Sequence, residues 1–446
     1  MAKKQHIVII GAGLVGSLLS IYLQKRGCKV DIYERRPDMR KASIRAGKSI
    51  NLALSNRGWR PLTEVGIENE LKKLIIPMKG RMMHDLKGNL SFQPYGKEGQ
   101  AINSISRGGL NSLLMDTAEA QGVKFHFEYR CEGIDFDRTI AYVENNDTSL
   151  DIHADIIIGA DGAYSAVRNE MQKTDRFNYS QQYIPHGYKE LSFPATSSND
   201  FSVDKNALHI WPRKDFMLIA LPNLDRSFTV TLFMAFKGVK SFDKLKTNEE
   251  ILDFFQTEFS DALKLMPNLI EEFNENPTSS LVTVKSYPWI KNNVCVIGDA
   301  AHAIVPFYGQ GMIAGFEDCY VLNNLLDEHN DNWQLALEAF QQERKPDTDA
   351  IADLALENFV VMRDKVADEK FLLRKKIEAH ICSLYPDKWI PLYSMVTFIE
   401  DMRYSDALAK GKKQGRIMDE VMATLTPEQD WSTLDFAAII AKLENS

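Results

Sequence analysis

A glycine-rich turn between two predicted strands, within residues 7–34, limits the possible folds of this chain more than any other segment. An apolar run at 7–10 predicts a short buried strand, and the segment G-A-G-L-V-G follows it at 11–16. A helical pattern then ends near Gly27, and a second predicted strand, 29–34, closes with an acid. This order is typical of a βαβ unit that binds the pyrophosphate of a dinucleotide, with Glu34 on the ribose.

Two later segments favour a flavin dinucleotide over a nicotinamide one. Asp161-Gly162 ends a predicted buried strand, and Gly298-Asp299 ends another. The sequence F-Y-G-Q-G-M at 307–312 then predicts a glycine-flanked turn that opens a helix. Ligands of open α/β sheets collect at the carboxyl ends of the strands, and a helix N-terminus favours negative charge. We therefore expect these segments and the βαβ unit to bind one FAD.

The composition sets mild limits on function. With 446 residues, 44% of them hydrophobic, the chain is long enough for about two to four domain-sized units. Its net charge of −8 argues against nucleic acid as a partner. Five scattered cysteines indicate free thiols in a reducing cytoplasm. The longest candidate for a membrane-spanning stretch, 389–399, is shorter than the roughly 20 residues that a membrane span needs, so we expect a soluble protein.

The pattern along the chain predicts interleaved domains. Strand-like segments dominate at 78–95 and 184–236, and helices are expected from 312 onward. The basic, small-residue-rich stretch 45–55 predicts a loop that leads into a helix. We expect an FAD-binding domain over 1–75, 101–175 and 285–365. A β-sheet substrate-binding domain would cover 76–100 and 176–284, and a helical domain 366–446.

The motifs resemble a known family. G-x-G-x-x-G, the segment G-A-D-G-x-x-S-x-V-R at 159–168, and G-D-A-A-H with G-Q-G-M are similar to the class A FAD-dependent aromatic hydroxylases. Within that group, the chain resembles the kynurenine 3-monooxygenase family. The segments that carry this closer resemblance are 49–55, 79–83, 93–96, 186–191, 221–233, 355–358 and 393–398.

The resemblance implies a fold and an activity. The fold would be α/β, with an FAD-binding Rossmann-like (GR2-type) domain, an inserted antiparallel β-sheet substrate domain and a C-terminal helical region. The activity would be hydroxylation of L-kynurenine to 3-hydroxy-L-kynurenine through a flavin hydroperoxide, with NADPH and O₂ as co-substrates. Two alternatives remain open: a class A hydroxylase of another aryl acid, and a flavin redox module that does not hydroxylate. The histidines have no metal-ligand spacing, so no metal is expected.

The resemblance also assigns roles to individual residues. The substrate's carboxylate and amino end would be held by a small set in which Arg81 is the forked, always-charged partner. That set is Arg81, Tyr95, Asn358 and Tyr393. The residues expected at the reacting ring are Phe307, Tyr308, Gly309 and Gln310. Those expected to hold FAD are Gly11, Gly13, Leu14, Val15, Gly16, Glu34, Arg35, Arg107, Asp161, Gly162, Asp299, Gly311, Met312 and Ile313.

Two positions depart from the family pattern. The family usually continues G-Q-G-M with asparagine, whereas this chain has Ile313. If that position contributes its backbone N–H, the exchange is tolerable; if its side chain positions the flavin, FAD affinity or oxygen transfer would fall. Eukaryotic members carry a membrane-anchoring tail, whereas 436–444 here predicts a short amphipathic segment, which supports a soluble enzyme.

Overall fold

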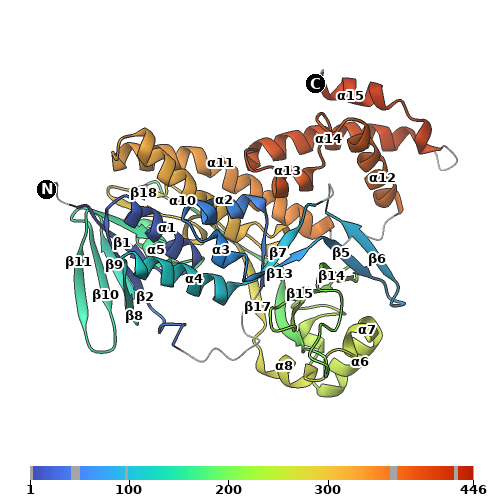
Figure 1. Cartoon of the computed structure of the whole chain (residues 1–446), viewed down its shortest axis with the longest axis horizontal. Coiled ribbons are helices and arrows are strands. Elements are labelled where there is room, and N and C mark those ends of the chain that lie inside the picture. Colours follow the sequence, from blue (N-terminus) through green and yellow to red (C-terminus); the bar gives the residue numbers. More distant parts are fainter. Residues whose placement is uncertain (1–3, 42–50, 96–98, 362–368, 426–429, 445–446) are drawn as a thin grey trace.

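The computed structural model describes residues 4–41, 51–95, 99–361, 369–425 and 430–444 (Figure 1). It has the predicted fold class: a largely parallel α/β sheet, a second large sheet that is mostly antiparallel, and a helical C-terminal region. Within the described ranges, we find no helix with the length and apolar character that crossing a bilayer requires.

A six-stranded sheet forms the nucleotide-binding part of the fold. Its order is β18-β19-β12-β1-β2-β8, and β19, β12, β1, β2 and β8 run parallel. The predicted strands at 7–10, 29–34 and 156–159 are confirmed as neighbours. The bounds are β1 (His6–Ile10), β2 (Lys29–Glu34), β8 (Lys124–Phe127), β12 (Ile156–Gly159), β18 (Ile290–Lys291) and β19 (Val294–Val296).

Helices cover this sheet because its strands are apolar on both faces. The helices α1, α4 and α10 lie together in Figure 1, and α2 packs against α10. Leu18, Leu19 and Leu23 of α1 are completely buried in the same core as β1. The bounds are α1 (Leu14–Lys25), α2 (Asn56–Glu64), α3 (Glu68–Leu71), α4 (Arg107–Ala120), α5 (Ala166–Met171), α9 (Asp299–His302) and α10 (Gly311–Glu328).

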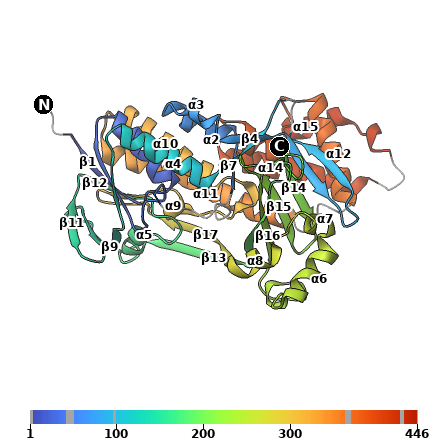
Figure 2. The same ribbon diagram turned by 60° about the horizontal axis from the view of Figure 1, so that its bottom comes forward.

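A seven-stranded sheet forms the second part, in the order β17-β13-β16-β15-β14-β5-β6. Figure 2 shows its long strands β13 and β17 side by side, reaching back toward the first sheet. The expectation of an antiparallel sheet is wrong at one place, because β14 pairs with β5 in parallel. The bounds are β5 (Gly80–His84), β6 (Leu90–Pro94), β13 (Asn178–Phe193), β14 (Ala207–Pro212), β15 (Met217–Pro222), β16 (Phe228–Ala235) and β17 (Ser279–Tyr287).

Short helices and a 3-10 turn pack on one face of this sheet through Phe255, Phe259 and other apolar side chains. Their bounds are α6 (Asn248–Glu258), α7 (Ser260–Leu263), α8 (Leu269–Glu275) and η1 (Phe242–Lys244). A further 3-10 turn, η2 (Pro306–Tyr308), precedes α10. The proposed division of the chain into domains stays a prediction.

Two small sheets were not predicted from the sequence. One has the order β3-β7-β4, and the other β11-β10-β9. The expected loop at 45–55 is wrong for 51–54, which is β3, because that strand pairs with the distant β7; residues 45–50 lie outside the described part of the chain. The expected helix does follow, as α2. The bounds are β3 (Asn51–Leu54), β4 (Ile75–Met78), β7 (Ile102–Ser106), β9 (Arg130–Asp135), β10 (Ile140–Glu144) and β11 (Ser149–His153).

The C-terminal region is helical, as predicted, and lies at the end of the molecule opposite the N-terminus in Figure 1. The short amphipathic segment predicted at 436–444 is α15. Its residues Phe436, Ile439 and Ile440 are buried against α12 and α14. The bounds are α11 (Trp333–Val360), α12 (Glu369–Leu384), α13 (Leu392–Phe398), α14 (Tyr404–Thr424), η4 (Trp431–Thr433) and α15 (Phe436–Glu444).

Candidate functional site

Four segments expected at FAD meet at one edge of the six-stranded sheet. Gly11 follows β1, Glu34 ends β2, and Asp161 and Asp299 follow β12 and β19. Backbone hydrogen bonds continue past the strands: Ala160 N donates to Ile10 O at 2.8 Å, and Ile297 N to Gly159 O at 2.9 Å. Because these strands are adjacent and parallel, their carboxyl ends form a single row. The sequence prediction that these segments converge is confirmed.

The glycine turn between β1 and α1 is crowded at two glycines and open at the third. A Cβ on Gly11, where φ is +108°, would lie 2.6 Å from Ala160 O, and one on Gly16 would lie 2.1 Å from Gly11 O. A Cβ on Gly13 would meet no atom within 4 Å. Gly13 is the N-cap of α1, whose first residues, Leu14 and Val15, are half-buried. The open space at this helix N-terminus fits a pyrophosphate.

Glu34 lies at the end of β2 and is almost fully buried. Its carboxylate accepts hydrogen bonds from Ala12 N at 3.0 Å and from Arg36 Nε at 2.8 Å. Burial by itself raises the pKa of Glu34, but Arg36 and Ala12 outweigh it and hold that pKa below its usual range. The ionised carboxylate thus braces the glycine turn from behind. Arg35, beside it, is exposed.

Asp161 and Gly162 follow β12 and begin the turn into α5. Asp161 Oδ2 accepts hydrogen bonds from Ala166 N at 2.6 Å and Val167 N at 3.3 Å, whereas its Oδ1 is buried without a partner among the described residues. Burial raises the pKa of Asp161. A buried carboxylate oxygen without a donor is costly, so this atom fits a ligand hydroxyl. Gly162 has φ +82° and open space beside it.

Asp299 is the first residue of α9, and its side chain is exposed to solvent although many protein atoms lie nearby. The protein around it raises its pKa through desolvation, against the opposing effect of Arg107. Arg107 is the first residue of α4 and is also exposed. The preceding Gly298 has φ +60°, and a Cβ there would lie 3.0 Å from Val15 Cγ2. The turn thus lies against the glycine fingerprint and presents its carboxylate outward, which fits the ribityl chain of FAD.

The turn that opens α10 is preformed. Gly309 has φ +69°, and α10 begins at Gly311, as predicted. Ala314 N donates to Gln310 O at 2.8 Å, so the N–H groups of Gly311, Met312 and Ile313 precede the helical ladder. These three donors at a helix N-terminus fit an electron-rich ring.

Two side chains of this turn are buried among protein atoms. The side-chain oxygen of Gln310, Oε1, accepts a hydrogen bond from the hydroxyl of Tyr404 at 2.9 Å. Ile313 is completely buried; a Cβ on Gly58 of α2 would lie 3.0 Å from Ile313 Cγ1. The structure therefore favours the backbone role at Ile313, for which the departure from the family's asparagine is tolerable. Met312 is half-buried.

The expected substrate residues Arg81, Tyr95 and Tyr393 come together from β5, the end of β6 and α13. The guanidinium carbon of Arg81 lies 4.5 Å from the Tyr393 ring centre and 5.4 Å from that of Tyr95. Tyr308 stacks on Tyr393 with ring centres 5.4 Å apart. The side chains of Arg81 and Tyr95 interact with each other, but Arg81 Nε and the Tyr95 hydroxyl are buried without a well-aligned hydrogen bond to any described residue. Burial raises the pKa of Tyr95 and Tyr308, so both phenols stay protonated.

Asn358 contacts this cluster through the backbone of Phe307. Its side-chain amide donates to Phe307 O at 2.7 Å. Phe307 itself is buried between Phe359, at 4.4 Å between ring centres, and Phe233, at 5.2 Å. Asn358 thus supports η2, whereas Phe307 forms part of an aromatic wall.

Sequence reasoning missed several residues that hold these turns in place. They are Arg57, Asn111, Asp318, Arg344 and Tyr404. Asn111 donates to Ala12 O at 3.0 Å. Asp318 lies within α10, and Arg57, Arg344 and Tyr404 lie on the helices around it. The acidic pair Glu317-Asp318, within the largely apolar stretch 312–322, was the available signal. Within the described ranges, no three His, Cys, Asp or Glu side chains are arranged to hold a metal ion.

Comparisons with known proteins agree with this geometry. The family model described as an FAD binding domain matches residues 4–355. Kynurenine 3-monooxygenase of Christiangramia forsetii is 49% identical and covers 99% of both chains, and that of Sus scrofa is 44% identical over 94% of this chain and 89% of its own.

Solved structures support the fold. The structure of 2-methyl-3-hydroxypyridine-5-carboxylic acid oxygenase matches with a TM-score of 0.68 and 20% identity, over 82% of this chain and 94% of that one. A probable FAD-dependent monooxygenase from Pseudomonas aeruginosa matches with a TM-score of 0.65 and 18% identity, over 81% of this chain and 97% of that one. At these identities, the likeness concerns the fold alone.

The FAD binding domain match and the kynurenine 3-monooxygenase relatives, to which the row of strand ends and the open glycine turn conform, identify an FAD-dependent aromatic monooxygenase. Within that class, the near-complete coverage at 44–49% identity is decisive. The chain belongs to the kynurenine 3-monooxygenase family.

Proposed function

We propose that this enzyme hydroxylates L-kynurenine to 3-hydroxy-L-kynurenine, a step of tryptophan catabolism that leads toward NAD biosynthesis. NADPH, a proton, O₂ and L-kynurenine would give NADP⁺, water and the hydroxylated product. The observation that carries the substrate assignment is the pair of buried donors at Arg81 and Tyr95 that lack a well-aligned hydrogen bond within the described ranges. Such donors need an acceptor, and an amino-acid carboxylate supplies one.

The substrate would lie across the cluster of Arg81, Tyr95 and Tyr393. Arg81 Nε and the protonated Tyr95 hydroxyl would donate to its carboxylate, and Tyr393 lies over the guanidinium. The ring end would extend toward Tyr308 and the apolar wall at Phe307, where the two aromatic side chains exclude water. Asn358 maintains this wall through its bond to Phe307 O.

The cofactor would be held by the row of strand ends. Gly13 and the α1 N-terminus would take the pyrophosphate, Glu34 the adenosine ribose, and Asp299 the ribityl chain, with Asp161 Oδ1 accepting from a further hydroxyl. When bound, FAD would provide the redox chemistry, namely hydride acceptance from NADPH and activation of O₂. The N–H groups of 311–313 favour negative charge on its ring. Gly309 and Gln310 set the direction of these donors, since their turn precedes α10.

The domain division and the compartment complete the proposal. The FAD-binding domain would comprise 1–75, 101–175 and 285–365, and the substrate-binding domain 76–100 and 176–284, with 366–446 as the helical domain. Residues 366–368, 426–429 and 445–446 of this last domain lie outside the described part of the chain. We place the enzyme in the cytoplasm because the five cysteines, all within the described ranges, form no disulfide.

A turnover experiment tests the proposed function. The purified protein, reconstituted with FAD, is given NADPH with and without L-kynurenine, and both NADPH oxidation and 3-hydroxykynurenine are followed. We expect kynurenine to stimulate oxidation and product to form in proportion. Stimulated oxidation without product would point to another aryl acid as substrate. No stimulation at all would leave a flavin redox module, and no flavin absorption band would refute every flavin-based function.

A further inference from the structure

A buried ion pair lies directly behind the two turns assigned to FAD, and no step of the proposed reaction uses it. Asp318 on α10 is completely buried, and Arg344 on α11 is 3% exposed. Arg344 Nε donates to Asp318 Oδ1 at 2.7 Å. Burial of two charges is costly, so the position of this pair needs a reason other than stability alone.

The carboxylate side of the pair holds the turn before Asp299. Asp318 Oδ2 accepts a hydrogen bond from Gly298 N at 3.1 Å, and His302 Nε2 lies 2.5 Å from the same oxygen. Gly298 immediately precedes Asp299, and His302 ends α9. Asp318 thus fixes both ends of the short segment that presents the Asp299 carboxylate.

Close packing places α10 against this turn. A Cβ on Gly315 would lie 2.6 Å from Val15 Cγ2 and 3.6 Å from Gly298 Cα. Gly315 and Asp318 are three residues apart in the helix and therefore lie on the same face. The absent side chain at Gly315 brings the Asp318 carboxylate within hydrogen-bond distance of Gly298.

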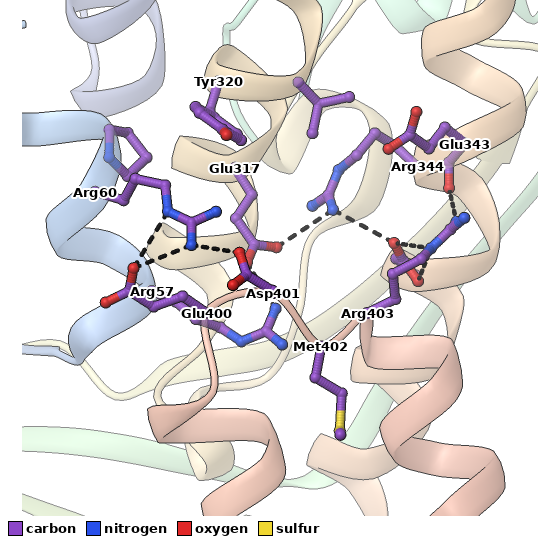
Figure 3. A pocket seen from close by; sticks show the side chains of 13 residues that line it. Arg57, Arg60, Glu317, Tyr320, Glu343, Arg344, Glu400, Asp401, Met402 and Arg403 are labelled. Atoms are coloured by element: carbon purple, nitrogen blue, oxygen red, sulfur yellow. Dashed lines mark hydrogen bonds and ion pairs between the residues drawn. The ribbon is translucent and has the colours of Figure 1, made fainter. Parts of the chain in front are cut away.

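The guanidinium side of the pair holds the first turn of α10. Arg344 Nη2 donates to Ala314 O at 3.1 Å, and Ala314 N donates to Gln310 O at 2.8 Å. Arg344 Nη1 lies 3.2 Å from Glu317 Oε2, and Figure 3 shows this contact between α11 and α10. The ion pair therefore connects the Asp299 turn to the N–H groups of 311–313.

A further series of contacts leads from Glu317 back to Gln310, in the turn before α10. Glu317 Oε1 accepts from Arg57 Nη1 at 2.7 Å, and the guanidinium of Arg57 lies 4.2 Å from the ring centre of Tyr404. The Tyr404 hydroxyl donates to Gln310 Oε1. Helices α2, α10, α11 and α14 thus brace one turn from several directions.

Both members of the pair are charged. Burial alone would raise the pKa of Asp318, but His302 and Arg344 outweigh it and hold that pKa below its usual range. Burial alone would lower the pKa of Arg344, but Asp318 and Glu317 raise it. A charged carboxylate can accept all three hydrogen bonds at once, which an amide of the same shape cannot.

We infer that Asp318, together with Arg344, is a positioning residue for FAD: it fixes the carboxylate of Asp299 and the N–H donors of α10 at one mutual distance. This inference rests on the proposed function, because it presumes FAD at these turns. A rigid distance matters since the two turns would contact the ribityl chain and the ring of one molecule.

The test measures cofactor binding by the whole chain without kynurenine. Asp318→Asn keeps the size of the side chain and removes its charge. We expect it to raise the Kd for FAD about 10-fold to 100-fold, as loss of a supporting contact to a ligand-holding residue typically does. The midpoint potential of the bound flavin should become more negative, because the displaced N–H donors stabilise its reduced form less. A separate kinetic assay with L-kynurenine at saturating FAD should give a KM within about twofold of the wild-type value.

Asp31→Asn is the matched control. Asp31 is also a buried carboxylate, and it contacts His6 and His126 by hydrogen bonds, but it touches neither turn. We expect this variant to lose thermal stability while retaining the wild-type Kd for FAD and the wild-type flavin potential. If Asp318→Asn fails to fold, Arg344→Lys keeps the charge, loses the bond to Ala314 O, and should show the same shifts to a smaller extent.

The outcomes separate this inference from the proposed function. Wild-type Kd and potential in Asp318→Asn, or in Arg344→Lys if the first variant does not fold, would overturn the inference. Equal losses of FAD affinity in Asp318→Asn and Asp31→Asn would also overturn it, because they would indicate general destabilisation. A wild-type chain that binds FAD but does not hydroxylate kynurenine would refute the proposed function and leave this inference standing.

Discussion

The cofactor cradle, formed by the strand ends and the turns before α9 and α10, differs from the cluster of Arg81, Tyr95 and Tyr393 in how completely its polar atoms are satisfied. At the cradle, Glu34 and Asp318 accept several hydrogen bonds each. At the substrate cluster, Arg81 Nε and the Tyr95 hydroxyl are buried without a well-aligned hydrogen bond to any described residue. Under the proposed assignment, the cradle would be built before FAD arrives, whereas the cluster would be completed by its substrate.

The lifetimes of the two proposed ligands would account for this difference. A cofactor that remains bound through many turnovers gains from preorganised backbone donors, which cost nothing further to arrange. A substrate that must enter and leave is recognised by groups whose hydrogen bonds it alone supplies, because an analogue lacking the carboxylate leaves them unpaired. The cradle has exceptions: His302 Nδ1, Asn111 Oδ1 and Asp161 Oδ1 are buried without partners among the described residues, and a cofactor hydroxyl would satisfy the last of them.

Alanine at two glycines gives the largest expected effects on the cradle. Gly16→Ala would place a Cβ 2.1 Å from Gly11 O, so we expect the FAD-free protein to lose about 3 kcal/mol of unfolding free energy. Gly13→Ala meets no protein atom within 4 Å and should leave the FAD-free protein as stable as wild type. It should nevertheless raise the Kd for FAD by about 100-fold, because the methyl occupies the pyrophosphate's place.

Chemical denaturation and FAD titration of both variants check this pair of expectations. A stable Gly16→Ala protein, or a Gly13→Ala protein with wild-type FAD affinity, would contradict the preformed cradle.

Acid should loosen the strands behind the substrate cluster before it affects the cradle. His209 on β14 is buried beside β5, its Nδ1 lies 2.9 Å from His84 Nε2, and His84 pairs with Asp261. Burial lowers the pKa of His209 to about 4. An unfolded histidine titrates near 6.5, so between about pH 6.5 and 4 the unfolded chain binds the extra proton. Stability contributed by neutral His209 is thus full above that window and falls by up to about 3 kcal/mol across it.

Hydrogen exchange of the β5 and β14 amides, compared with those of β1 and β12 between about pH 7 and 4.5, measures this effect after correction for the intrinsic rates. We expect protection to fall first in β5 and β14, and His209→Gln should remove that selective pH dependence. Equal loss of protection in both sheets would mean that another group controls the acid response.

Removal of the arginine tests the substrate cluster directly. Arg81→Ala should raise the KM for L-kynurenine about 10-fold to 100-fold, as expected for the loss of a charge-assisted contact of about 1.5–3 kcal/mol. The Kd for FAD should change little, since Arg81 lies on β5, away from the row of strand ends. Steady-state kinetics and FAD titration provide the two numbers. An unchanged KM would show that Arg81 does not bind the substrate. A parallel loss of FAD affinity would show that the cluster and the cofactor cradle are not independent.

The smallest expected effect comes from one hydroxyl. Tyr404→Phe removes the hydrogen bond to Gln310 Oε1 and leaves that oxygen without its donor. We expect the Kd for FAD to rise about threefold to tenfold, corresponding to about 0.5–1.5 kcal/mol. Tyr385→Phe is the matched control, because Tyr385 packs in the apolar cluster of α12, α14 and α15. It should leave the FAD affinity unchanged. Equal affinities in the two variants would show that the cradle does not depend on α14.

Local patterns in the sequence predicted the cofactor region well. The βαβ unit, the strand before Asp161 and the helix that opens at Gly311 each depend on residues close together in the chain, so periodicity and turn chemistry reveal them. The strand at 51–54 was missed because it is stabilised by pairing with β7, about 50 residues away. The substrate residues were named through a family resemblance, since no local pattern distinguishes Arg81 from a surface arginine.

Residue order alone was enough to establish the nucleotide-binding unit, the flavin-type turns and the family. The folded arrangement was needed to show which side chains brace the turns. Gln310 and Ile313 are buried among protein atoms, and Asp318 holds the turn before Asp299. Distance along the chain explains this division. Neighbouring residues determine where turns and strand ends form. The hydrogen bonds from Arg344 of α11 and Tyr404 of α14 to the start of α10 form only after those helices have packed.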